Sequence, residues 1–313
     1  MITTLDGILE AVRSYPRQTV AVAVAQERNV LEAVRDALAQ DLADAILIGD
    51  RSQIHRLMEN VGCSAEHLQV IHEPDELRAA RKACEVVRAG DAQILMKGLL
   101  HTDDFLRAVL DRETGLRTSS IMSHVFLMET PGRGKLTLVT DGAMNIAPDL
   151  ETKAAILLNA VLVANALGVQ RPKVGVLAAT EQVNPKMPAT LDAAALHAMS
   201  HRNQFPTCLV DGPLALDNAV SPEAARIKNI AGDVAGDCDI LLCPDIESGN
   251  ILVKTFAFLA GGKTAGVLVG AAAPVVLTSR ADSAQAKLYS IGTAVLLAGM
   301  QRSGRIKVGR VHF

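Results

Sequence analysis

The sequence of 313 residues has few aromatic side chains: it contains no Trp, two Tyr and six Phe. Its hydrophobic share is nevertheless 49% and its charged share 21%, which are ordinary values for a globular protein with a sizeable core. The interior must therefore consist of Ala, Val, Leu and Ile, a composition typical of a parallel sheet covered by helices. The length suits one large domain or two moderate ones.

Features that the sequence lacks argue against several classes of protein. The formal net charge is −3, so no basic surface for nucleic acid is expected. No apolar run reaches the roughly 18 residues that a membrane span requires. The first residues include Asp6, Glu10 and Arg13, unlike a secretory leader. We expect a cytoplasmic protein with neither nucleic acid nor membrane as a partner.

Motifs for metal and nucleotide sites are also absent from the sequence. No GxGxxG follows the first strand, and no GxxxxGK[ST], HExxH or GxSxG occurs. Residues 260–264 resemble half of a P-loop, but they lie between a helix and a strand, so Gly261 and Gly262 are interpreted as a helix end. No metal site is predicted. The cysteines match no redox or zinc spacing and are expected to be free, buried thiols: Cys63, Cys84, Cys208, Cys238 and Cys243.

Strand-like apolar runs alternate with segments of helical spacing along the chain. This alternation predicts βαβ units and a mainly parallel sheet. A polar, hairpin-like turn at 129–135 interrupts it, and a domain border is placed there: residues 1–128 and 267–313 form a first α/β domain, and 129–266 a second. Strands are expected at 19–25, 45–49, 68–71, 92–96, 121–128, 136–139, 174–178, 209–214, 239–243, 265–269 and 275–277. Helices are expected at 5–14, 30–39, 54–61, 75–89, 102–110, 150–167, 190–200, 251–260 and 287–298.

Polar residues follow the ends of several predicted strands. In open α/β sheets ligands bind beyond the carboxyl ends of the strands, where the next helix can hold an anion. We therefore expect Asp245, Asn250, Ser279 and Arg280 to line a site for a phosphate-bearing ligand.

Lys97 also ends a strand, and the glycine after it would allow a ligand to approach closely. The alternatives are that Lys97 is merely solvated and that His101 is an ordinary loop residue. Thr102 or Asp103 is expected to cap the next helix, as Asp149 and Ser221 are expected to cap later ones.

Five segments together resemble the phosphate acetyltransferase and phosphate butyryltransferase family. The resemblance runs from about residue 20 to about residue 300, and its most specific parts are a PDxxxGN segment followed by an SRxxS segment. The five segments are Met-Lys-Gly-Leu-Leu-His-Thr at 96–102, Val-Asn-Pro-Lys-Met-Pro-Ala-Thr at 183–190, Ala-Gly-Asp-Val-Ala-Gly at 231–236, Pro-Asp-Ile-Glu-Ser-Gly-Asn at 244–250 and Ser-Arg-Ala-Asp-Ser at 279–283.

The resemblance implies reversible transfer of an acetyl or butyryl group between coenzyme A and inorganic phosphate. Acyl-CoA, phosphate and acyl phosphate would be the ligands, with coenzyme A as a substrate and no bound cofactor. It also implies a two-domain α/β/α fold with mainly parallel sheets, like that of the isocitrate and isopropylmalate dehydrogenases, with the active site in the cleft between the domains. A homodimer is the expected minimum assembly.

Site residues follow from matching the family's segments to this chain. Ser279 and Arg280 match a catalytic serine–arginine pair, and Arg107 matches an arginine that follows the family's histidine segment. In the expected mechanism Ser279 and Lys97 donate to the developing oxyanion, while Arg280 and Arg107 hold phosphate. Further residues are expected to bind phosphate or coenzyme A: His101, Asn145, Asp245 and Asn250.

One departure from the family concerns the base that takes the thiol proton. The family's aspartate lies just after the SRxxS segment, where this chain has Ala284-Gln285-Ala286-Lys287; butyryl-type members resemble the present form. Either Asp282 or Asp245 serves instead, or the thiol's own ionisation suffices.

Two other functions stay open, the second of them because of this departure. One is an NAD-dependent decarboxylating dehydrogenase of the same fold, which would need an aspartate cluster for a metal ion. The other is an acyl-CoA or acyl-phosphate sensor that has lost catalysis.

Overall fold

The computed structural model describes residues 1–64, 68–205 and 207–304, which form two compact units. The first unit comprises Leu5–Ser120 and residues 265–304, and the second comprises Met1–Thr4 and Ile121–Thr264. The sequence predicts domain borders after residues 128 and 266 and an active site between the domains. Both stay predictions. The predicted first domain includes residues 305–313, which lie outside the described chain.

The first unit is an α/β structure, as predicted. Its strands, in spatial order, are β3, β2, β1, β4, β11 and β10, and all neighbouring pairs are parallel except β11–β10. Its elements are α1 (Leu5–Val12), β1 (Gln18–Ala23), α2 (Arg28–Ala39), β2 (Ala43–Gly49), α3 (Arg51–Val61), β3 (Leu68–His72), α4 (Glu76–Ala89), β4 (Ile94–Lys97), α5 (Thr102–Leu110), β10 (Lys263–Val269), β11 (Val275–Val276) and α11 (Ala284–Arg302).

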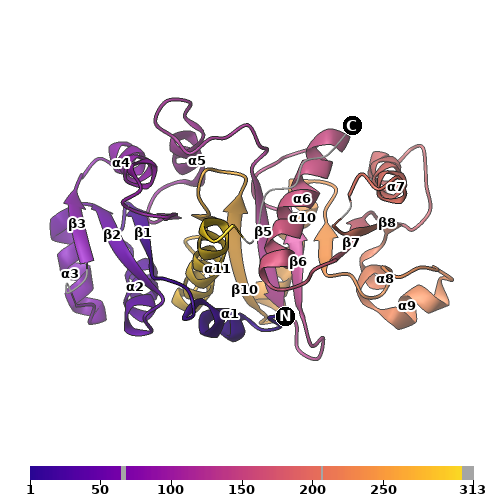
Figure 1. Cartoon of the computed structure of the whole chain (residues 1–313), viewed down its shortest axis with the longest axis horizontal. Coiled ribbons are helices and arrows are strands. Elements are labelled where there is room, and N and C mark those ends of the chain that lie inside the picture. Colours follow the sequence, from indigo (N-terminus) through magenta and orange to yellow (C-terminus); the bar gives the residue numbers. More distant parts are fainter. Residues whose placement is uncertain (65–67, 206, 305–313) are drawn as a thin grey trace. The chain divides into compact units, whose positions relative to one another are not determined.

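Helices cover both faces of the strands of the first unit (Figure 1). Helices α4 and α5 pack together on one face, whereas α11 packs with α1 and α2 on the other. The strands β1, β2, β4 and β11 between them are almost wholly buried, and Ala21, Val22 and Ile94 have no exposed surface, whereas the edge strand β3 is partly exposed. This two-sided burial explains why the strands are continuous apolar runs without alternation.

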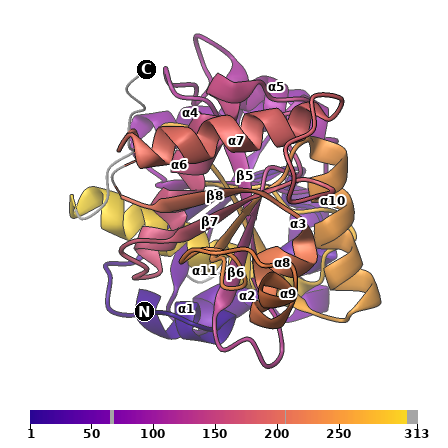
Figure 2. The same cartoon turned by 90° about the vertical axis from the view of Figure 1, so that its right-hand side faces the viewer.

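The second unit is also α/β. Its strands run in the order β5, β6, β9, β7 and β8; β5 and β6 form the predicted antiparallel hairpin, and the other pairs are parallel. Figure 2 shows α7 on one side of β7 and β8, with α8 and α9 on the other. Its elements are β5 (Ser123–Glu129), β6 (Leu136–Thr140), α6 (Leu150–Ala166), β7 (Lys173–Leu177), α7 (Pro188–His201), β8 (Leu209–Leu214), α8 (Leu216–Val220), α9 (Pro222–Ile227), β9 (Ile240–Leu242), α10 (Ile246–Lys254) and the π-helical turn η1 (Thr255–Leu259).

The helix starts test the expected caps. Asp149 accepts a hydrogen bond from the main-chain N–H of Thr152, and Ser221 caps α9, so both of these predictions are confirmed. The expected caps of α5 are wrong, because His101 occupies the N-cap position and no side chain caps this helix. Thr102 and Asp103 therefore lie inside the first turn, where an acidic side chain interacts favourably with the helix dipole.

Helix α10 also begins earlier than expected. The sequence placed its start at Ile251, but it begins at Ile246, because the Asp245 carboxylate accepts from the main-chain N–H of Ser248. The polar residues and the glycine of the PDxxxGN segment suggested a loop, whereas most of the segment is the first half of a capped helix.

All five cysteines are free and buried, as expected. Burial raises the pKa of Cys84, Cys208, Cys238 and Cys243 to about 12, which makes these thiols unreactive. In the part of the chain that the structure describes, no helix is long and apolar enough to cross a membrane.

Candidate active site

The carboxyl ends of β4 and β11 bring together most of the predicted catalytic residues. The two strands are parallel neighbours, with Met96 opposite Val276. Lys97 is the last residue of β4, and Ser279 and Arg280 follow β11. These three residues therefore lie at one edge of the strands of the first unit, as residues of an open-sheet ligand site would; that they bind a ligand stays a prediction.

The loop after β11 is a compact turn that its own side chains hold. The Asp282 carboxylate accepts from the main-chain N–H of Ser279 at 2.8 Å, and the Ser279 hydroxyl accepts from that of Ala281 at 3.3 Å. Ser283 then caps α11 by accepting from Ala286. Ser279 and Arg280 are exposed at the tip of this turn, where a ligand can reach them.

Arg280 lies beside His101, with 3.4 Å between its Nη2 and the His101 Nδ1. His101 precedes α5, so two segments remote in sequence present a guanidinium and an imidazole at one place. Arg107 is not part of this arrangement. It is exposed on α5 and pairs with Asp104 at 3.0 Å, and none of its hydrogen bonds or ion pairs within the described residues reaches the loop after β11.

Lys97 is buried, which excludes its interpretation as a merely solvated lysine; only 3% of its surface is exposed. Its ammonium donates to the main-chain oxygens of Gly98 at 3.0 Å and Leu100 at 3.2 Å. Burial lowers the pKa of Lys97 to about 8; the Glu27 carboxylate opposes this shift, and the positive charge of Lys287 adds to it. Lys97 is thus a buried cation close to losing its proton.

Glycine is required directly after Lys97. A Cβ on Gly98 would lie 2.2 Å from the main-chain oxygen of Val24 and 2.7 Å from that of Ala23. The sequence suggested that this glycine allows a ligand to approach closely. Instead, the chain leaving β4 itself passes closely against the end of β1. The structure assigns this glycine to chain packing.

Two charged residues of this region were not predicted as site residues. Lys287, 1% exposed, donates to the Ser279 main-chain oxygen at 2.7 Å, and its Nζ lies 3.5 Å from the Glu27 Oε1. Glu27 lies between β1 and α2, at the carboxyl end of a strand next to β4. The rule that ligands bind beyond the carboxyl ends of strands, applied to β1, would have identified Glu27 as a candidate. Nothing local in the sequence indicates its contact with Lys287.

In the second unit, Asp141 organises the loop after β6. Its carboxylate accepts from the main-chain N–H groups of Ala143, Met144 and Asn145, and from the Asn145 side-chain amide at 2.6 Å. Burial raises the pKa of Asp141, although these hydrogen bonds oppose the shift. The Asn145 amide also donates to the Met122 main-chain oxygen. Both donors of Asn145 thus hold the protein's own chain.

The predicted binding residues of the PDxxxGN segment lie against the same loop. The Asn250 side-chain amide donates to the Gly142 main-chain oxygen at 3.0 Å, and Asp245 caps α10. Asn145, Asp245 and Asn250 are therefore brought together in the second unit, while Lys97, His101, Ser279, Arg280 and Asp282 are brought together in the first.

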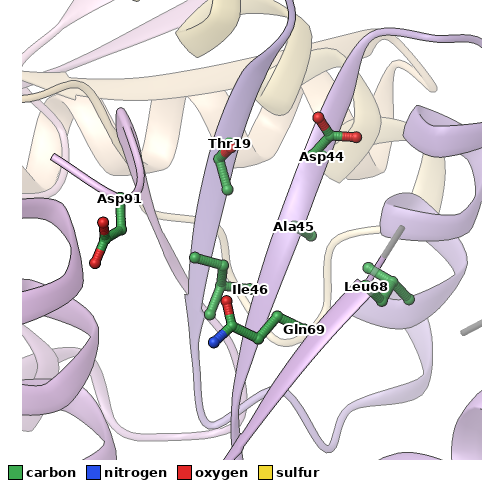
Figure 3. A pocket seen from close by; sticks show the side chains of 7 residues that line it. All are labelled: Thr19, Asp44, Ala45, Ile46, Leu68, Gln69 and Asp91. Atoms are coloured by element: carbon green, nitrogen blue, oxygen red, sulfur yellow. The ribbon is translucent and has the colours of Figure 1, made fainter. Parts of the chain in front are cut away.

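A shallow pocket lies at the amino-terminal side of the first unit's strands, away from these residues. Thr19, Asp44 and Gln69 line it, together with Ala45, Ile46, Leu68 and Asp91 (Figure 3). It contains none of the predicted site residues, and Asp44 pairs with Arg17 at 3.0 Å. No group of three or more His, Cys, Asp or Glu side chains suited to a metal ion occurs among the residues described.

Comparison with known proteins covers almost the whole chain. The profile of the family described as "Phosphate acetyl/butaryl transferase" matches residues 3–81 and 68–295. A phosphate butyryltransferase of Clostridium acetobutylicum is 49% identical over 299 residues, covering 96% of this chain and 99% of the relative. A phosphate acetyltransferase of Thermotoga maritima is 43% identical over 294 residues, covering 94% and 99%. The crystal structure of a branched-chain phosphotransacylase from Enterococcus faecalis V583 matches with a TM-score of 0.79 and 37% identity, covering 90% of this chain and 99% of that one.

Proposed function

The chain belongs to the phosphate acetyl/butaryl transferase family, and we propose that it prefers butyryl to acetyl groups. The resemblance found in the sequence is thereby confirmed. The chain is a phosphate acyltransferase, which moves a short acyl group between coenzyme A and inorganic phosphate. The residues that perform this transfer, and the size of the acyl group, are part of the proposal.

The observation that carries the assignment of the site is the meeting of cations at the ends of β4 and β11. Arg280 lies exposed beside His101, and the buried ammonium groups of Lys97 and Lys287 lie behind the same loop. A planar guanidinium binds phosphate oxygens through paired hydrogen bonds, and further positive charge nearby strengthens that contact. We assign phosphate and the phosphoryl group of acyl phosphate to Arg280, with His101 beside it.

The proposed reaction proceeds by direct attack of the coenzyme A thiolate on the acyl-phosphate carbonyl. Ser279 and Lys97 stabilise the negative charge that develops on the carbonyl oxygen. An ammonium group has three donors, and Lys97 gives two of them to main-chain oxygens, so one remains for the oxyanion. The Ser279 hydroxyl accepts one internal hydrogen bond, which leaves its proton available.

The residues of the second unit take a supporting part in this proposal. Asn145 and Asn250 hold the loop after β6, and Asp245 fixes the start of α10, so that main-chain groups there contact coenzyme A or phosphate. Arg107 is exposed and remains a candidate for a second phosphate contact. We further propose that the protein works in the cytoplasm as a homodimer, with coenzyme A as a substrate and without a resident cofactor.

The preference for butyryl groups is supported by Lys287, which matches the butyryl-type form of the segment after SRxxS, and by the butyryltransferase among the relatives. The test is release of free thiol from acetyl-, propionyl- and butyryl-CoA with and without phosphate. Each buried CH₂ contributes about 0.8 kcal/mol, so kcat/KM for butyryl-CoA should exceed that for acetyl-CoA by about tenfold. An equal or higher value for acetyl-CoA would reverse the preference, and binding without thiol release would indicate a sensor.

No observation favours the dehydrogenase alternative. The aspartate cluster that it requires does not occur in the described ranges of the chain. The remaining check is direct: chelator-treated protein should retain acyl transfer, and nicotinamide absorbance should stay constant with 2-hydroxy acids. Metal-dependent reduction of NAD would contradict the transferase assignment.

A further inference from the structure

The residue that follows the acid-free segment after SRxxS has a carboxylate partner from a different element. Residues 284–286 carry no acid, but Lys287, the next residue on α11, is in contact with Glu27. The Glu27 Oε1 lies 3.5 Å from the Lys287 Nζ, and the Glu27 side chain is 13% exposed whereas that of Lys287 is 1% exposed. Of the two side chains, Glu27 is thus the one that solvent, or a thiol, can reach.

The position of Glu27 is fixed by the chain around it. Glu27 occupies the N-cap position of α2, where its main-chain oxygen accepts from Leu31. In the first turn of α2, the Asn29 side-chain amide donates to the main-chain oxygen of Asp282 at 3.2 Å. The start of α2 is therefore held against the loop that carries Ser279 and Arg280, which keeps the backbone of Glu27 next to that loop.

The other carboxylates considered for the base are engaged in holding the chain. Asp282 accepts from the main-chain N–H of Ser279, and Asp245 accepts from that of Ser248 at a helix start. Glu27, although it is itself an N-cap residue, makes no side-chain capping bond. Its oxygens are left for its lysine partner and for a substrate.

We infer that Glu27 is the general base that accepts the proton of the coenzyme A thiol. This inference rests on the proposed acyl transfer. The S–H proton moves to the carboxylate, the sulfur electron pair forms the C–S bond to the acyl carbon, and the C–O bond to phosphate breaks. The proton then passes to the departing phosphate, so the products are acyl-CoA and hydrogen phosphate. In the reverse direction protonated Glu27 returns the proton to the leaving thiolate.

Other charged groups face Glu27 and contribute to any pH profile. Lys287 on α11 contacts Glu27 directly, and Lys97 at the end of β4 interacts electrostatically with Glu27, with Lys287, and with Arg280 and Asp282 in the loop after β11. Arg28, the next residue in the chain, pairs instead with Glu32 at 2.8 Å. Glu27→Gln also removes the Glu27 charge that raises the pKa of Lys97, so its pH profile is compared with that of Glu27→Asp, which keeps this charge.

The experiment measures kcat/KM for coenzyme A with butyryl phosphate between about pH 6 and pH 8, for the wild type and for Glu27→Gln. The wild-type rate should vary little. The variant should be about 10²–10⁴-fold slower at neutral pH, because a positioned base contributes that factor. Its rate should rise about tenfold per pH unit, because it then depends on the thiolate fraction of a thiol with a pKa of about 8.5. The wild-type to variant ratio should therefore shrink as pH rises.

Two matched variants control the measurement. Glu27→Asp keeps a carboxylate and should restore a flat profile with part of the rate. Glu32→Gln removes the same charge elsewhere on α2, from an ion pair at the surface, and should behave as wild type. If the wild type and Glu32→Gln both fail to transfer acyl groups to phosphate, the proposed function is wrong; loss confined to Glu27→Gln leaves it intact.

A purely structural role for Glu27 predicts different results. If Glu27 only neutralises the buried Lys287, Glu27→Gln would lower thermal stability and keep the wild-type pH profile. The double variant Glu27→Gln/Lys287→Met removes the unpaired charge, so it should fold even if the single variant does not. A steep profile in this double variant supports the base, and a flat one at near wild-type rate overturns it.

Discussion

Gly142 and Gly249 pack main chain against main chain. A Cβ built on Gly249 would lie 2.9 Å from the Gly142 Cα, and one built on Gly142 would lie 2.8 Å from the Gly249 carbonyl carbon. The loop after β6 and helix α10 can approach this closely only because both residues lack a side chain. The glycine of the PDxxxGN segment thus serves to hold the two segments together.

Gly249→Ala should destabilise the protein. The new methyl carbon would lie 2.5 Å from the main-chain oxygen of Asp141, so backbone must shift. Overpacking of this kind costs about 1–3 kcal/mol, measured as the free energy of unfolding in urea. Ile251→Ala is the control, because Ile251 is 65% exposed on the same helix and its loss should change stability by no more than about 0.5 kcal/mol. Equal stability of the two variants would contradict the close packing.

Arg280→Ala should impair the use of phosphate while the protein stays folded, because the side chain is exposed. A hydrogen bond to a charged group is worth about 1.5–3 kcal/mol, so kcat/KM for phosphate should fall by roughly 10- to 150-fold. Arg17→Ala, which removes a guanidinium at the other end of the strands, is the control and should keep wild-type kinetics. Unchanged kinetics in folded Arg280→Ala would remove Arg280 from the phosphate site.

Lys97 should make stability rise with pH above about 8. Its pKa is about 8 in the folded protein against 10.5 in the unfolded chain, so between these values the unfolded state binds more protons. The free energy of unfolding of wild type, relative to that of Lys97→Met, should therefore increase by about 3 kcal/mol from neutral pH to about pH 10.5. The buried thiols lower the free energy of unfolding as pH rises. This effect is the same in both proteins, so it cancels in the comparison. A pH-independent difference would show that Lys97 has an ordinary pKa.

Ala286→Asp should partly rescue Glu27→Gln. Ala286 lies in the first turn of α11, directly before Lys287, where the family's aspartate is expected. A carboxylate there should flatten the pH profile and recover at least about tenfold in rate at neutral pH. Gln285→Asp, an exposed neighbour in the same turn, adds the same charge without the same position. Equal recovery by both variants would indicate a general charge effect and count against a positioned base.

Much of the fold follows from local patterns. Continuous apolar runs predicted the strands because most of them are buried on both faces, and Lys97 and Ser279 were singled out because they follow strand ends, where ligands bind in open sheets. The start of α10 was misplaced because Gly249 weakens helix propensity; close packing against Gly142 outweighs that local cost.

The sequence alone determined the α/β class and the family, and it predicted Lys97, Ser279 and Arg280 as site residues, because periodicity and short motifs are properties of neighbouring residues. It also showed that a carboxylate is missing after the SRxxS segment. Only the tertiary structure brought Glu27 to Lys287, since that contact joins the start of α2 to α11. A contact between such distant segments depends on how β1, β4 and β11 lie side by side, and no local pattern encodes it.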